Sequence, residues 1–137
     1  MPHNVYSKIY LHFTWHTKNN EPILKSEVLK ALNTFVRSKC EKTKEVLFIS
    51  FGGIENHVHL AVKVPPSLNI AQWIGEIKGF SSHEIKGSFS LNNFSWQEGY
   101  GVVSFSERDL DTIVEYIENQ PKYHKANKLF TSLENAG

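Results

Sequence analysis

The sequence is nearly free of cysteine, and its single thiol, Cys40, excludes both a disulfide framework and a zinc site built from thiolates. It also lacks an apolar run approaching the roughly 18 residues that a membrane-spanning helix needs, and its polar start does not resemble a targeting segment. We therefore expect a cytoplasmic protein that works under reducing conditions.

A surplus of positive charge is also missing. The formal net charge is +1 and the pI is near 7.9, which argues against binding duplex DNA through many phosphates, because that mode depends on lysine and arginine. Repeats, low-complexity tracts and linkers are absent too. With 137 residues, 40% hydrophobic and 21% charged, the chain has the size and balance of one globular domain, so we expect a single domain over residues 1–137 with one site.

Alternating apolar and polar residues predict strands over residues 5–16, 46–51, 57–64 and 100–105. Apolar residues at helical spacing predict helices over 26–42, with Ser26 as its cap, and over 69–86. Gly52 and Gly53 indicate a turn or bulge, and Pro65 with Pro66 ends the third strand.

A third helix is predicted to open at a capping box formed by Ser106 and Asp109, and Pro121 is predicted to end or kink it. The order strand, helix, strand, strand, helix, strand is typical of an α+β fold, the ferredoxin-like βαββαβ antiparallel sheet with helices on one face, here followed by a C-terminal helix. The other face of the sheet is expected to remain free for a ligand.

Two histidines of the third predicted strand could serve a metal ion. His57 and His59 are two apart and therefore point to the same side of the strand, within reach of one ion, while Val58 packs inward. The chain has seven histidines, so such a pair also arises by chance, and two solvated histidines on an open sheet face are the structural alternative.

Tyr116 and Gln120 are four residues apart and so are neighbours on the third predicted helix, beside its apolar stripe. A helical tyrosine is most often a residue at the edge of the core with a satisfied hydroxyl. Only its combination with the histidine pair gives it a functional interpretation.

These residues belong to blocks that resemble a known family, the single-tyrosine HUH transposases of small insertion sequences and their REP-associated tyrosine transposase relatives. The blocks stand in the family's order from about residue 10 to 130. They are His12-Phe13-Thr14-Trp15-His16-Thr17-Lys18 with Pro22, Asn56-His57-Val58-His59-Leu60 with Pro65-Pro66, Ile77-Lys78-Gly79-Phe80-Ser81-Ser82, Trp96-Gln97-Glu98-Gly99-Tyr100, and Tyr116-Ile117-Glu118-Asn119-Gln120-Pro121 with His124 just after.

The resemblance implies a site and a reaction. His57, His59 and Gln120 would bind a divalent metal, Mg²⁺ or Mn²⁺, and Tyr116 would attack a phosphodiester of single-stranded DNA with hairpin ends, leaving a 5′-phosphotyrosine and a free 3′-hydroxyl. It also implies a homodimer, and leaves open whether the tyrosine helix completes the site of its own subunit or that of the partner. On chemical grounds Mn²⁺ suits both imidazole and oxygen ligands, and the phenol needs a base because its reference pKa is near 10.

Several lysines could contact the DNA backbone. Single strands are held by aromatic stacking and a modest basic groove, which agrees with the low net charge. The candidates are Lys63 on the histidine face, Lys78 in the second helix, and Lys122, Lys125 and Lys128 after the tyrosine. For each of them a solvated surface charge is the alternative.

Two other functions stay open from the sequence. One is a non-catalytic, ferredoxin-like domain that binds single-stranded nucleic acid, although the presence of Tyr116, His57, His59 and Gln120 together speaks against it. The other is a small metallohydrolase in which water is the nucleophile and Tyr116 is structural; its DNA products would carry no protein.

Overall fold

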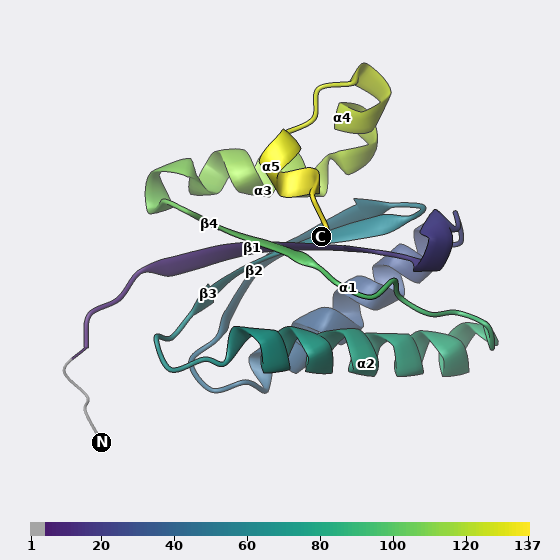
Figure 1. Ribbon diagram of the computed structural model, residues 1–137, viewed down its shortest axis with the longest axis horizontal. Coiled ribbons are helices and arrows are strands. Elements are labelled where there is room, and N and C mark those ends of the chain that lie inside the picture. Colours follow the sequence, from purple (N-terminus) through teal and green to yellow (C-terminus); the bar gives the residue numbers. More distant parts are fainter. Residues whose placement is uncertain (1–4) are drawn as a thin grey trace.

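The computed structural model describes residues 5–137, which form one twisted antiparallel sheet between two layers of helices (Figure 1). The strands are β1 Ile9–His16, β2 Leu47–Ile54, β3 His57–Val64 and β4 Gly101–Phe105. Their order across the sheet is β2-β3-β1-β4, so β1 and β3 are central. This arrangement confirms the predicted α+β, ferredoxin-like βαββαβ fold.

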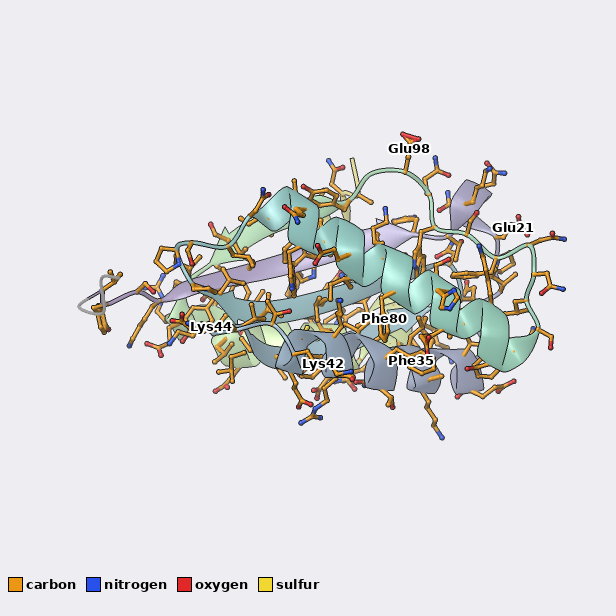
Figure 2. The ribbon with its side chains drawn as sticks, turned by 90° about the horizontal axis from the view of Figure 1, so that it is seen from below. Glu21, Phe35, Lys42, Lys44, Phe80 and Glu98 are labelled. Carbon is orange, nitrogen blue, oxygen red and sulfur yellow. The ribbon has the colours of Figure 1, made fainter. Side chains whose placement is uncertain are left out.

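Helices α1 (Ser26–Glu41) and α2 (Ile70–Phe89) cover one face of the sheet. Phe13 and Trp15 of β1 and Leu60 of β3 are fully buried beneath them in the main hydrophobic core. Phe35 of α1 and Phe80 of α2 meet edge to face with ring centroids 6.5 Å apart, where the two helices lie side by side (Figure 2). The alternation along β1 and β3 therefore sends its apolar half to this layer.

The second face of the sheet is covered as well, which differs from the free face expected from the sequence. Three C-terminal helices lie over it (Figure 1): α3 Leu110–Glu118, α4 Gln120–Ala126 and α5 Thr131–Glu134. Ile113 and Ile117 of α3 pack with Ala61 of β3 and Leu133 of α5 in a second, smaller core. The apolar stripe of α3 needs a surface to cover it, and the small side chain of Ala61 leaves room on β3.

Several local predictions need correction. Residues 5–8 precede β1 rather than belonging to it, and Gly52 and Gly53 lie within β2, whose bulge falls between Phe48 and Ser50. Lys25, not Ser26, precedes α1, and no side chain caps that helix. Ser106 does act as a cap, but for the short 3-10 turn η2, Glu107–Asp109, that leads into α3.

The kink expected at Pro121 is confirmed: the chain leaves helical geometry at Asn119, and Pro121 stands at the start of α4. Gln120 therefore begins a new helix instead of continuing the one that carries Tyr116. Within residues 5–137, the structure contains no helix that is long and apolar enough to cross a membrane.

Candidate active site

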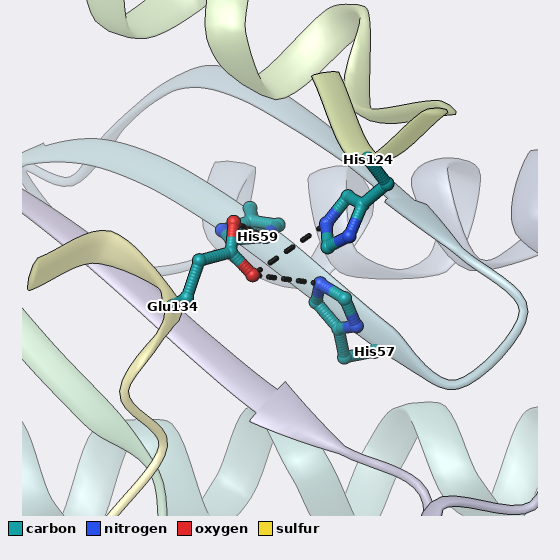
Figure 3. Close-up of side chains that lie close together, drawn as sticks. All are labelled: His57, His59, His124 and Glu134. Carbon is teal, nitrogen blue, oxygen red and sulfur yellow. Dashed lines mark ion pairs between the residues drawn. The ribbon is translucent and has the colours of Figure 1, made fainter. Parts of the chain in front are cut away.

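His57 and His59 open strand β3 and point to the same side of it, as their spacing predicts, with ring centroids 5.1 Å apart. They are not solvated: their side chains are 4% and 0% exposed, because α3, α4 and α5 cover this part of the sheet. Both Nε2 atoms face the carboxylate of Glu134 from α5, His57 at 3.0 Å and His59 at 3.4 Å (Figure 3).

The opposite nitrogen of each ring is fixed by a hydrogen bond. Nδ1 of His57 lies 2.8 Å from Oδ1 of Asn56, and Nδ1 of His59 lies 2.9 Å from Nε2 of His12, a residue of β1 with 1% exposure. The two Nε2 atoms, although buried, have no hydrogen-bond partner even at the short distances to Glu134. Rings oriented through one nitrogen while the other stays unpaired are the arrangement expected of metal ligands.

Four side chains could therefore hold a metal ion. Among residues 5–137, the donor atoms of His57, His59, His124 and Glu134 lie within 4.8 Å of one another. Nε2 of His124, from α4, is 3.6 Å from Oε1 of Glu134 (Figure 3). Three imidazoles and a carboxylate fit a divalent transition ion better than Mg²⁺, which favours oxygen ligands.

Tyr116 reaches the same group from α3. Its ring centroid is 5.8 Å from that of His59, and its hydroxyl donates to Oε2 of Glu134 while accepting from the backbone N–H of Phe130 at 3.2 Å. Burial, and next the bond to Glu134, raise the pKa of the phenol to about 12. In this arrangement the hydroxyl is thus protonated and has no exposed surface.

Gln120 lies beside the group, fully buried, and acts as a link between helices. Its amide nitrogen donates to the backbone oxygen of Tyr116 at 3.0 Å, and its Oε1 is 2.9 Å from Nε2 of His124. The carbonyl oxygen has a second lone pair available for an ion. The structure thus brings together all four residues predicted from the sequence, with the Gln120 oxygen paired to His124.

The charge balance of the group is set by its burial. Burial lowers the pKa of His59 and of His124, so these imidazoles are held neutral, as metal binding requires. For Glu134 burial opposes ionisation, but the contacts from His57, His59 and Tyr116 outweigh it and keep the pKa of the carboxyl below its usual range. The group therefore combines the carboxylate of Glu134 with the neutral rings of His59 and His124.

A family model described as "Transposase IS200 like" matches residues 5–120 of the chain. The chain belongs to this family. It is 24% identical over 115 residues to the transposase for insertion sequence element IS200 of Salmonella typhimurium, a match that spans 80% of this chain and 74% of that protein. The same transposase from Salmonella typhi matches equally well.

Two solved structures share the fold of this IS200-like transposase. A putative transposase from Deinococcus radiodurans superposes with a TM-score of 0.70 at 24% identity, over 88% of this chain and 96% of that one. A REP-associated tyrosine transposase bound to a REP hairpin superposes with a TM-score of 0.58 at 18% identity, over 90% of this chain and 73% of that one.

The candidate DNA-binding lysines of this IS200-like transposase lie in different settings. Lys122, Lys125 and Lys128 are exposed, on or just after α4, close to the site. Lys63 is at the other end of β3, roughly 20 Å along the strand from His57. Lys78 holds the loop before β4, since its ammonium donates to the backbone oxygens of Gln97 and Gly99 at 2.8 and 2.7 Å, an arrangement that favours a structural role.

Three residues of the site have no role in the sequence interpretation: His12, His124 and Glu134. The alternation along β1 puts His12 on the same face as the third strand's histidines, and the spacing of four between Gln120 and His124 puts both on one side of a helix, so pattern alone could have indicated them. Glu134 lies beyond the matched residues, after a separate turn of helix, and the sequence carries no signal for it.

Proposed function

We propose that this IS200-like transposase cuts and rejoins single-stranded DNA at hairpin ends, with Tyr116 as the nucleophile. The observation that carries the proposal is that one carboxylate, that of Glu134, is contacted both by the Tyr116 hydroxyl and by the Nε2 atoms of His57 and His59, at 3.0 and 3.4 Å. A group of similar size that carries anionic oxygens, such as a phosphodiester, would meet the same three side chains.

In the proposed reaction the phenolic oxygen of Tyr116 bonds to phosphorus and the bond from phosphorus to the 3′ oxygen breaks. The phenol proton leaves to a base, and the 3′ oxygen takes up a proton to become a free hydroxyl. The product is a 5′-phosphotyrosine, which conserves the phosphodiester energy so that a later 3′-hydroxyl can reverse the step and join new ends without ATP.

The residues present fit a divalent metal, and we propose that His57, His59 and Gln120 hold it as Mg²⁺ or Mn²⁺. When bound, such an ion withdraws the negative charge that develops on the phosphate oxygens. In support, Nδ1 of each imidazole is held by His12 or Asn56, which leaves Nε2 for the ion, and the Gln120 oxygen lies 2.9 Å from Nε2 of His124, the neighbour of His57. The mixed nitrogen and oxygen set favours Mn²⁺ over Mg²⁺.

Lys122 and Lys125 are proposed to steer the single strand, together with Lys128, because they are exposed on or just after α4, the helix that carries Gln120 and His124. Lys63 stays a weaker candidate because of its distance from His57 along β3.

We also propose that the protein is a homodimer and that it acts in the cytoplasm, where its DNA substrate would be.

The decisive experiment is the formation of a covalent adduct between the protein and a single-stranded hairpin oligonucleotide in Mn²⁺, detected on a denaturing gel. Tyr116→Phe should abolish the adduct. Tyr123→Phe is the matched control, since its ring lies 4.9 Å from that of Tyr116 but its hydroxyl donates to Glu115, away from the histidines. Adduct in Tyr116→Phe, or its loss in Tyr123→Phe, would show that the nucleophile is wrong.

The same gel tests the two other functions. Cut DNA without attached protein would indicate a metallohydrolase that uses water. Hairpin binding that is unchanged by EDTA, with no cleavage in any metal, would indicate a non-catalytic binding domain.

A further inference from the structure

The segment after α4 returns to the sheet and ends over the candidate site. Its one-turn helix, α5, lies beside α3 above β1 and β4 (Figure 1). Leu133 anchors it, with 5% exposure, in the small core that also contains Ile113 and Ile117. This C-terminal segment is therefore packed against the rest of the protein.

Phe130 covers the nucleophile. Its ring is stacked on that of Tyr116, with centroids 4.1 Å apart and planes inclined by 8°. Its backbone N–H also donates a hydrogen bond to the Tyr116 hydroxyl oxygen, at 3.2 Å. A DNA strand cannot approach the phenolic oxygen from this side while Phe130 is in place.

Glu134 fills the space in front of the nucleophile. Oε1 is 3.0 Å from Nε2 of His57 and 3.6 Å from Nε2 of His124, whereas Oε2 is 3.4 Å from Nε2 of His59 and accepts from the Tyr116 hydroxyl (Figure 3). Both carboxylate oxygens are thus used by the groups that the scissile phosphate requires. A carboxylate and a phosphodiester offer the same chemistry here, a pair of anionic oxygens, so they cannot be bound together.

The backbone after Glu134 is fitted to strand β4. The carbonyl oxygen of Asn135 lies directly against Gly101, where a Cβ atom would overlap it, and Cγ2 of Thr14 closes the other side. The close approach requires glycine at this position of β4 and gives a means to dislodge the segment without changing any residue of the candidate site.

We propose that residues 129–137 form an autoinhibitory plug, in which the Glu134 carboxylate occupies the position of the scissile phosphate and must leave before Tyr116 can attack DNA. The inference rests on the proposed function, whose regulation it describes. Residues 129–137 lie outside the part of the chain that matches the family model, residues 5–120.

The alternative is that Glu134 assists the reaction, as a ligand of the ion or as the base that takes the proton from the phenol. The two roles predict changes of opposite sign when the carboxylate is neutralised. Glu134→Gln keeps the size of the side chain and removes its charge; a plug would loosen, whereas a ligand or base would be lost.

The test compares the initial rates of adduct formation with a hairpin oligonucleotide in Mn²⁺. Loss of the charge-assisted contacts in Glu134→Gln should raise the rate about tenfold or more. Gly101→Ala, which displaces Asn135, should raise it too. The controls are Glu27→Gln, an exposed carboxylate on α1, and Gly79→Ala, where a new Cβ would touch nothing; both should match the unaltered protein. Rates for both test variants that equal or fall below their controls overturn the plug.

A second measurement does not depend on cleavage. Amide hydrogen exchange of residues 130–135 should accelerate in Glu134→Gln and Gly101→Ala, and in the unaltered protein when hairpin DNA is added in EDTA. Exchange that stays slow in the DNA complex overturns the plug even if adduct forms normally. If DNA speeds exchange but no variant ever forms adduct, the plug stands as a DNA-displaced segment and the proposed phosphoryl transfer fails.

Discussion

His12 illustrates how a residue outside the ligand set can decide what a ligand does. Its Nε2 lies 2.9 Å from Nδ1 of His59, and burial, followed by the nearness of His59, lowers its pKa to about 3, so it is neutral. For His59 to offer Nε2 to an ion, Nδ1 must carry the proton and donate it to His12. His12 is therefore the acceptor that selects the tautomer of His59.

Removing that acceptor should weaken metal binding. We expect His12→Leu to lower the affinity for Mn²⁺ about 10- to 100-fold, measured by titration calorimetry, while His12→Gln, which keeps an acceptor, retains more of it. His83→Ala changes an exposed histidine of α2 and serves as the control. Equal affinities in His12→Leu and His83→Ala would show that the orientation of His59 does not depend on His12.

Among the residues of the site, the sequence predicts those that are related by a regular spacing along a strand or helix. It misses those that are not related in this way. His57 and His59 follow from alternation along a strand, and Tyr116 with Gln120 from the helical spacing of four. Glu134 reaches the site only because the chain turns back after Asn127, whose left-handed backbone ends α4. No local pattern encodes such a return.

At the scale of elements, the packing of α3 on the sheet explains why the second face is closed. The backbone oxygen of Ile117 lies so near Gly52 that a Cβ atom there would overlap it. Gly52 was predicted to be a turn residue, since glycine most often indicates a break in a strand. In the structure it permits the close approach of a helix to the middle of a strand. This contact depends on tertiary structure, so no local sequence pattern predicts it.

Two glycine-to-alanine substitutions should therefore change stability in opposite directions. Gly52→Ala should lower the free energy of unfolding by about 1–3 kcal/mol, since α3 has to move away from β2. Gly79→Ala, on the exposed side of α2 with open space around it, should raise it by about 0.5–1 kcal/mol by restricting the unfolded chain. Urea unfolding of both variants checks the pair, and a stable Gly52→Ala protein would mean that α3 is not held against β2.

At the scale of the whole molecule, the site is assembled from distant parts of one chain. β1 and β3 supply His12, His57 and His59, whereas α4 supplies the His124 imidazole and the Gln120 amide. The phenol comes from α3, and the carboxylate that it contacts comes from α5. The order of the strands was predictable because alternation and helix periodicity are local. The relative placement of α3, α4 and α5 was not, because it depends on the kink at Asn119 and the turn at Asn127.

Because Tyr116 contacts the histidine site of its own chain and α3 is packed tightly on β2, we expect each site to be completed within one subunit, even in a homodimer. Tyr116→Phe and His57→Ala proteins, each inactive, should then give no more adduct when co-expressed with different tags and purified as mixed dimers than either gives alone. Were the tyrosine helix exchanged between subunits, each mixed dimer would contain one site with both an intact phenol and an intact imidazole. Adduct attached to the His57→Ala chain of such dimers would show that exchange. As a control, mixed dimers of the unaltered protein and Tyr116→Phe should form adduct, which shows that mixed dimers are active.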